Sequence, residues 1–197
     1  MRRFITLVTI AALAAAAVTQ WQRVKELGRQ VLSRGTTEEV GASAEANKAL
    51  VRRSFEEVFN QGNLDAVEEI FAPDYVLHDP TSPEEIRGTE GMRRYVSMYR
   101  SAFPDLQQTI EDQIADGEKV ATRFTGRGTH HGELIGIAPT GNRVEAQGIV
   151  IDRISGGKIA ESWANYDALG MMQQIGAIPS PGEQPSGTPS EGQEPPS

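Results

Sequence analysis

The segment KIAESWANYD, near the C-terminal end of the chain, combines large apolar side chains with carboxyl and amide groups. Successive side chains of a β-strand point to opposite faces, so every second residue is expected on one face: Ile159, Glu161, Trp163, Asn165 and Asp167. Apolar walls with a few inward polar groups are typical of a ligand pocket, so we expect Glu161, Trp163 and Asn165 to contact a substrate. A partly desolvated carboxylate is a stronger base near neutral pH, which makes Asp167 the first candidate for acid/base catalysis.

Asp167 also directly precedes the helix-forming stretch ALGMMQQ. Aspartate is a preferred N-cap residue because its side chain accepts a hydrogen bond from a free backbone N–H of the first turn. Capping stabilises the charged form of the carboxylate and makes it a weaker base. The sequence therefore leaves two hypotheses for Asp167, an acid/base catalyst and a helix cap.

Two histidines are further catalytic candidates. In the strand-like stretch VATRFTGRGTH, His130 shares a face with Phe124, whereas the adjacent His131 points the opposite way. His130 could hydrogen-bond a substrate carbonyl or enolate, or it could be a loop histidine satisfied by the backbone. His78 is followed by Asp79, which could orient the imidazole at a pocket rim, or the two could form a surface turn.

The sequence gives little support for a metal site or for a nucleic-acid partner. The chain has no cysteine, which removes disulfides, thiolate nucleophiles and cysteine-bound zinc. A site could be drawn from His78, Asp79 and His130, but these residues lack the ligand spacing of known metal sites, so we predict no metal. Asp and Glu total 27 against 19 Lys and Arg. An acidic surface repels phosphate backbones, so no nucleic-acid partner is expected.

Helical periodicity precedes strand periodicity along the chain. Apolar residues recur every three or four positions in NKALVRRSFEEVFNQG, after Asn63 and Thr89, which can cap helices, and again in DALGMMQQIGAIP. Four extended stretches follow the third helix: residues 106–115, 119–129, 143–155 and 158–166. Short connections indicate an antiparallel sheet, and helices before strands indicate an α+β domain with helices on one face of the sheet. Tyr99, Phe124 and Met171 are expected in the core or the pocket wall.

One connection, GTHHGELIGIAPTGNRVE, joins the second and third extended stretches. Its Pro-Thr-Gly triplet supplies turn chemistry, and its glycines allow sharp curvature. We interpret it as a long hairpin between two central strands, in which His130 is the one functional candidate.

The two ends of the chain differ from the middle. Residues 1–22 carry two arginines ahead of a long uncharged run and are interpreted as a signal peptide or a membrane anchor, with membrane association through residues 4–22. The protein is therefore expected to be exported or membrane-anchored. Residues 23–43 are interpreted as a partly helical linker, 44–178 as the folded domain, and 179–197, rich in Pro, Ser, Gly and Glu, as a disordered tail.

Several segments together carry a family resemblance: FNQGNLDAVEEIFAPDYVLHDP, RGTEGMRRYV, FPDL, GTHHGELIGIAPTGNRVE and DRISGGKIAESWANYDALGMMQQIGAIP. In this order they resemble the SnoaL-like polyketide cyclases of the NTF2-like group. The resemblance implies a cone, in which a strongly curved antiparallel sheet and three to four helices enclose a pocket. It also implies homodimers formed through the outer face of the sheet.

The resemblance further implies an intramolecular aldol condensation without metal or cofactor. The acid/base aspartate of the family falls on Asp167. A supporting histidine is implied on the preceding strand, where the stretch VIDRISGG offers Arg153 instead.

Two classes of function follow. The first is an enzyme, a cofactor-free cyclase, isomerase or related acid/base catalyst that acts on a small hydrophobic carbonyl compound. The second is a non-catalytic domain of the same shape, which binds a small hydrophobic molecule or dimerises. Fold families of this kind carry many chemistries, so the site has to decide between them.

Overall fold

A computed structural model describes residues 23, 25, 43–82 and 85–179 of the chain. The chain divides into two compact units, Met1–Ser43 and Ala44–Ser197, and nearly all described residues belong to the second. The predicted signal or anchor segment and the predicted tail lie outside the described residues. Within the described ranges, no helix combines the length and apolar character that a bilayer crossing requires.

The helices lie largely where the periodicity predicted them. Residues 43–53 form a helix that continues into the π-helical segment η1 (Ser54–Asn60). Three α-helices follow among the described residues: α2 (Ala66–Ile70), α3 (Gly88–Ala102) and α4 (Ala168–Gln174). The predicted caps at Asn63 and Thr89 are wrong. The cap positions of α2 and α3 are Asp65 and Arg87, and neither side chain makes a capping hydrogen bond. Asn63 instead accepts a hydrogen bond from the backbone N–H of Asp65, in the turn before α2.

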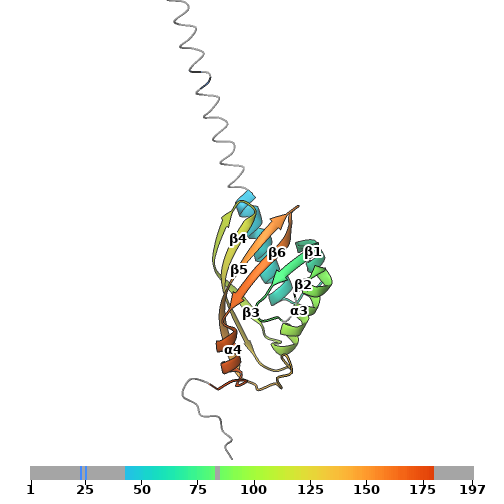
Figure 1. The fold of residues 1–197 in the computed structure, drawn as a ribbon, viewed down its shortest axis with the longest axis vertical. Coiled ribbons are helices and arrows are strands. Elements are labelled where there is room, and N and C mark those ends of the chain that lie inside the picture. Colours follow the sequence, from blue (N-terminus) through green and yellow to red (C-terminus); the bar gives the residue numbers. More distant parts are fainter. Residues whose placement is uncertain (1–22, 24, 26–42, 83–84, 180–197) are drawn as a thin grey trace, which may run out of the picture. The chain divides into compact units, whose positions relative to one another are not determined.

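Six strands form one open sheet, ordered β2-β1-β6-β5-β4-β3 (Figure 1). Their bounds are Phe71–His78 (β1), Ile86–Arg87 (β2), Gln107–Asp116 (β3), Lys119–Thr129 (β4), Arg143–Ser155 (β5) and Lys158–Tyr166 (β6). From β3 to β6, each strand pairs antiparallel with the next strand in the chain, as the connections between them predicted. β1 adds a parallel partner to β6, because the chain passes through α3 and the other strands before it returns beside β1. The α+β class with a curved sheet is confirmed.

The helices pack on one face of this sheet, where η1 contacts β3 and both α2 and α3 contact β1 (Figure 1). The core between them is apolar and almost closed to solvent. Its members include Val51, Val58, Val67, Ile70, Met92, Val96, Val120 and Ile159, none more than 1% exposed. Burial of these side chains is the main force that holds the helices on the sheet.

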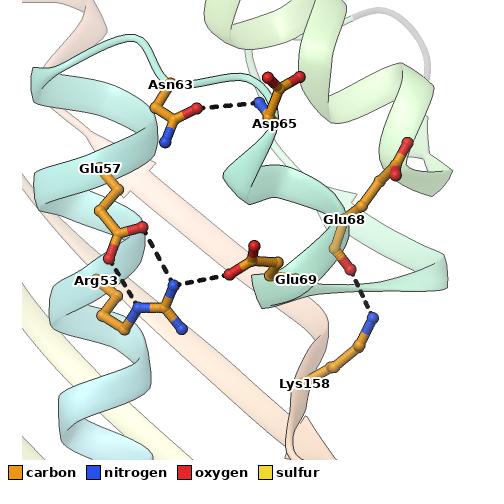
Figure 2. Close-up of polar contacts among 7 residues, drawn as sticks. All are labelled: Arg53, Glu57, Asn63, Asp65, Glu68, Glu69 and Lys158. Carbon is orange, nitrogen blue, oxygen red and sulfur yellow. Dashed lines mark hydrogen bonds and ion pairs between the residues drawn. The ribbon is translucent and has the colours of Figure 1, made fainter.

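Polar contacts fasten the short helix α2 to its neighbours (Figure 2). Arg53, on the first helix, donates hydrogen bonds to Glu57 of its own helix and to Glu69 of α2. Lys158, at the start of β6, donates to the backbone carbonyl of Glu68. A five-residue helix is not stable alone, so contacts of this kind and its buried apolar face fix its position.

Candidate active site

A cavity lies between the helices and the inner face of the sheet. It comprises about 970 Å³ of unoccupied space, part of it open to solvent. Its walls come from η1, β1, α3, β3, β4, β5, β6 and α4, and they are mainly apolar and aromatic. A concave, mostly apolar site with a few polar groups is the usual form of a small-molecule site.

The face of β6 that lines this cavity is not the face that was predicted from the sequence. Ser162, Ala164 and Tyr166 line the cavity, whereas the predicted residues Glu161, Trp163 and Asn165 do not. The predictions that these three residues line the pocket are therefore wrong.

The cause is an irregularity near the start of β6. Ile154 of β5 pairs with Ile159, but Arg153 pairs with Glu161, so Ala160 is an extra residue in this strand. A bulge of this kind inverts the alternation of side chains beyond it. Ile159 is buried in the core, and the inward position then passes to the even-numbered residues. Strict alternation from Ile159 does not account for this bulge, and it therefore assigns the wrong residues of β6 to the inner face.

The structure places Asp167 at the N-terminus of α4 and outside the cavity. The residue is exposed, and its Oδ1 accepts a hydrogen bond of 2.8 Å from the backbone N–H of Gly170. A Cβ atom on Gly170 would lie 2.2 Å from Asp167 Oδ2, so the glycine leaves room for the capping carboxylate. The prediction that Asp167 faces a pocket is wrong, and the helix-cap hypothesis describes its position.

His78 lies with Glu161 and Trp163 on the sheet face opposite the cavity. Its Nε2 is 3.0 Å from Glu161 Oε1, and its ring stacks on Trp163 with 5.4 Å between ring centroids. Arg153 donates to the other oxygen of Glu161. The hydrogen bonds from His78 and Arg153 lower the pKa of Glu161. These residues form a hydrogen-bonded cluster away from the cavity, with one ion pair between Arg153 and Glu161. The position of His78 therefore does not support its predicted role beside a substrate.

His130 is fully buried but does not line the cavity. Its ring packs on Phe103, its Nδ1 is 3.2 Å from the hydroxyl of Thr140, and its backbone N–H donates to the carbonyl of Asn142. Among the described residues, its Nε2 has no hydrogen-bond partner. The geometry matches the loop-histidine alternative, in which His130 holds the long hairpin between β4 and β5.

Three predicted residues do reach the cavity wall, namely Tyr99 from α3, Phe124 from β4 and Met171 from α4. Their contact with a substrate stays a prediction. Gly148 of β5 lies opposite Phe124, and a Cβ atom there would be 2.7 Å from the Phe124 ring. The absence of a side chain at Gly148 therefore lets this ring lie against the inner face of the sheet.

Asp152, which was not predicted from the sequence, is a carboxyl group in the cavity wall. It lies on the inner face of β5, and only 4% of its surface is exposed. The hydroxyl of Ser162, its pairing partner on β6, donates to Asp152 Oδ1 at 2.5 Å. Burial raises the pKa of Asp152 to about 7, although the hydrogen bond from Ser162 opposes the rise. Asp152 is therefore poised to take up and release a proton near neutral pH.

A pattern in the sequence could have indicated Asp152. Val150 and Ile154 flank it on the same face of β5, and both are buried. A carboxylate at the centre of an apolar strand face is costly unless it has a partner or a function. The strand was predicted with its observed bounds, so only this unusual position was overlooked.

A second polar group in the cavity is a cluster of hydroxyl groups around Asp79. Tyr95 donates to Asp79 Oδ2 at 3.0 Å, and the Thr81 hydroxyl donates to Asp79 Oδ1 at 2.7 Å. Tyr166 contacts Thr81 at 2.8 Å and Tyr99 at 2.7 Å, oxygen to oxygen. The three tyrosines line the cavity. Along β6, Tyr166 is four residues from Ser162, or about 13 Å at the usual rise of a strand.

Comparison with known proteins decides the family. Residues 49–175 match the family model described as SnoaL-like polyketide cyclase. The chain belongs to this family.

Several known proteins resemble the chain over most of their own length. Aklanonic acid methyl ester cyclase DnrD of Streptomyces peucetius is 32% identical over 64% of this chain and 88% of that protein. Nogalonic acid methyl ester cyclase of Streptomyces nogalater is 31% identical, over 60% and 89% of the two chains. Among solved structures, TsrD from Streptomyces laurentii has a TM-score of 0.62 and 29% identity, over 68% of this chain and 97% of that one. IdmH from Streptomyces antibioticus has a TM-score of 0.57 and 33% identity, over 66% and 98%.

Within this SnoaL-like domain, the histidines do not form a metal centre. His78 lies on the outer face and His130 in the hairpin. No group of three or more His, Asp or Glu side chains that could hold a metal ion occurs among the residues that the structure describes. The polar groups of the cavity wall include Asp152 with Ser162 and the three tyrosines of the hydroxyl cluster.

Proposed function

We propose that this member of the SnoaL-like family is an acid/base enzyme that uses Asp152 to move a proton on a small hydrophobic carbonyl compound. The observation that carries the proposal is the position of Asp152. It is buried in an apolar cavity, has a serine donor at 2.5 Å and has a pKa of about 7. Catalytic carboxyl groups are typically tuned toward neutral pH by burial in this manner.

The proposed reaction is an intramolecular aldol condensation without a cofactor. The Asp152 carboxylate removes a proton from a carbon beside a carbonyl group, and the electron pair of the C–H bond forms an enolate. The enolate carbon attacks a second carbonyl carbon in the same molecule, which forms a C–C bond and an alkoxide. The protonated Asp152 then gives its proton to the alkoxide oxygen, which restores the carboxylate.

Two details of the site suit this cycle. The apolar walls destabilise the charged form of Asp152, so it takes a proton more strongly than an aspartate in water. Ser162 stabilises the charged form by its hydrogen bond and holds the carboxyl group in place. Near neutral pH both protonation states are populated, as a group that removes and then returns a proton requires.

Relatives suggest substrates with which to begin. Two of the similar proteins are cyclases of aklanonic acid methyl ester and nogalonic acid methyl ester. We propose that the substrate of this chain belongs to the same broad class of polyketide-derived carbonyl compounds.

The test is turnover of these two esters by the wild type and by Asp152→Asn. We expect the substitution to lower kcat by about 10²- to 10⁴-fold, the usual contribution of a general acid/base group. Wild-type kcat/KM should rise with pH through about 7, because the carboxylate of Asp152 is the active form. Asn165→Ala, on the exposed outer face of β6, is the matched control and should retain activity. Equal turnover by Asp152→Asn and the wild type would contradict the proposal.

A non-catalytic ligand-binding domain is the second candidate, and the apolar lining of the cavity favours it. Next to Asp152 and Ser162, the following inward pair is Val150 and Ala164. These side chains offer contact area and no further proton-transfer group. Binding of both esters without conversion by the wild type would support this candidate and contradict the enzyme proposal.

A further inference from the structure

In the hydroxyl cluster at Asp79, the donor and the acceptor of every hydrogen bond can be assigned. The proposed reaction does not use this cluster. Asp79 is 7% exposed and accepts three hydrogen bonds, from the Thr81 backbone N–H, the Thr81 hydroxyl and the Tyr95 hydroxyl. A carboxylate accepts hydrogen bonds and has no proton to give. Thr81 and Tyr95 must therefore be the donors in these contacts.

The remaining directions follow one by one. A hydroxyl group has a single proton, and that of Thr81 is directed to Asp79. In the contact between Thr81 and Tyr166, Tyr166 must then donate. In the contact between Tyr166 and Tyr99, Tyr99 must donate for the same reason. The hydroxyl protons of Tyr99, Tyr166 and Thr81 thus all point toward Asp79 along this series of hydrogen bonds, and Tyr95 donates to Asp79 directly.

The three phenols keep these protons at neutral pH. Burial is the largest cause that raises the pKa of Tyr95, Tyr99 and Tyr166. The nearby charge of Asp79 raises all three in the same direction. The cluster therefore contains neutral hydroxyl groups.

The cluster ends at Tyr99, which lines the cavity. Its proton is used on Tyr166, but its oxygen still has lone pairs that can accept a hydrogen bond. A ligand oxygen without a hydrogen would find no donor here. A hydroxyl group would find an acceptor, and a site that is built for one hydrogen-bonding group rejects its analogue.

We propose that Tyr99, with Tyr166, Thr81 and Asp79 behind it, forms a subsite that accepts a hydrogen bond from a phenol or enol hydroxyl group of the ligand. This inference rests on the proposed function in that it assigns a substrate class to the same cavity, a polyketide-like molecule with a free hydroxyl group. The Cα atoms of Tyr166 and Ser162 are about 13 Å apart at the usual rise of a strand. A ligand that reaches both the subsite and Asp152 has to be extended or contain several rings.

The test is equilibrium binding of two matched probes, 2-hydroxyanthraquinone and 2-methoxyanthraquinone, measured by fluorescence titration. The informative quantity is the ratio of their dissociation constants, compared between proteins, because this comparison cancels the different hydration of the probes. In Tyr99→Phe, we expect the preference for the hydroxyl probe to fall by about tenfold, the effect of one hydrogen bond. The Phe ring preserves the packing of Tyr99. An unchanged ratio in Tyr99→Phe would overturn the proposal.

A second variant tests the order of the protons. Thr81→Val keeps the shape of an exposed side chain but removes the acceptor of Tyr166. The Tyr166 proton can then turn to Tyr99, which frees the Tyr99 proton for a ligand. We expect the ratio to shift toward the methoxy probe, and a shift toward the hydroxyl probe or no shift would contradict the order. Asn165→Ala is the control and should keep the wild-type ratio.

The two proposals fail in different measurements. The probe ratio is read without turnover, so inactivity of the wild type on both esters would leave the subsite intact. Conversely, an unchanged ratio in Tyr99→Phe would remove the subsite, while the kinetic test of Asp152 would still stand.

Discussion

Asp152 and Asp167 show how position decides the chemistry of one residue type. Both belong to the region where β5 and β6 pair, and Asp167 donates its backbone N–H to the carbonyl of Gln147 on β5. Asp152 is 4% exposed, and burial raises its pKa to about 7. Asp167 is exposed and its carboxylate caps a helix. The candidate base is therefore the buried carboxyl group of Asp152, although the family resemblance selects Asp167.

The largest expected difference between the two aspartates is in the pH dependence of stability. The pKa of Asp152 is about 7 in the folded state, against 3.8 for an ordinary aspartate, which we take as its value in the unfolded chain. Between these two pH values, the folded state holds a proton that the unfolded state releases. The free energy of unfolding therefore falls as pH rises, by on the order of 4 kcal/mol from Asp152 alone. Above about pH 7 the loss is complete.

Asp152→Asn should remove this contribution. Urea unfolding of the wild type and the variant between pH 4 and 8 measures it as a growing difference between the two proteins. Carboxylates that titrate at lower pH, such as Glu161 and Asp105, are common to both proteins and cancel. Parallel stability curves would show that Asp152 is not a buried, neutral acid.

Ser162→Ala sharpens the comparison from the side of the partner. The Ser162 hydrogen bond lowers the pKa of Asp152, so its loss should move the midpoint of the pH-linked transition to higher pH. At pH 8, where Asp152 is charged, we expect a destabilisation of about 2 kcal/mol, typical of a hydrogen bond to a charged group. The effect should be smaller at pH 5. A midpoint that stays in place or moves to lower pH would contradict the role of Ser162.

The cap at Asp167 should have a smaller and purely structural effect. Asp167→Ala is expected to lower the free energy of unfolding by about 1 kcal/mol, whereas Asp167→Asn should change it by only a few tenths, because Asn is an equally good cap. Turnover should be retained in both variants. Loss of turnover in Asp167→Asn would reverse the comparison and return the catalytic role to Asp167.

The smallest effect is expected on the outer face of β6. Glu161→Gln removes the ion pair with Arg153 and changes the hydrogen bond with His78. Ion pairs at a protein surface contribute little to stability because water and salt screen them. We expect a loss of stability below that of Asp167→Ala, no change in turnover, and a loss that shrinks further at high salt. A large fall in turnover would show that the outer face takes part in catalysis.

Much of the fold follows from local patterns. The bounds of β4, β5 and β6 match the predicted stretches, and β3 is displaced by one residue, because alternating β-formers between Gly-containing turns are a strong local signal. The cap residues of α2 and α3 and the parallel pairing of β1 with β6 were not predicted. These features depend on contacts between segments far apart in the chain, which no window of sequence contains.

The site was harder to predict than the fold. Alternation sorts the residues of a strand into two sets, but it does not say which set faces the helices. In β6, both Ile159 and Ser162 point toward the helices. They do so because the extra residue Ala160 shifts the inward positions from odd-numbered to even-numbered residues. One extra residue therefore moved Glu161, Trp163 and Asn165 out of the predicted pocket.

The family resemblance, the α+β class, most helices and strands, and the place of Tyr99, Phe124 and Met171 in the cavity wall could all be predicted from the amino-acid sequence. These follow from the period of the apolar residues and from motifs that are local in the chain. Three features could be seen only in the folded molecule: which aspartate is buried, which face of β6 lines the cavity, and which hydroxyl groups are hydrogen-bonded in the cluster at Asp79. Burial and hydrogen-bond partners belong to the packed molecule, because they arise where the bulged strand, α3 and the chain after β1 come together.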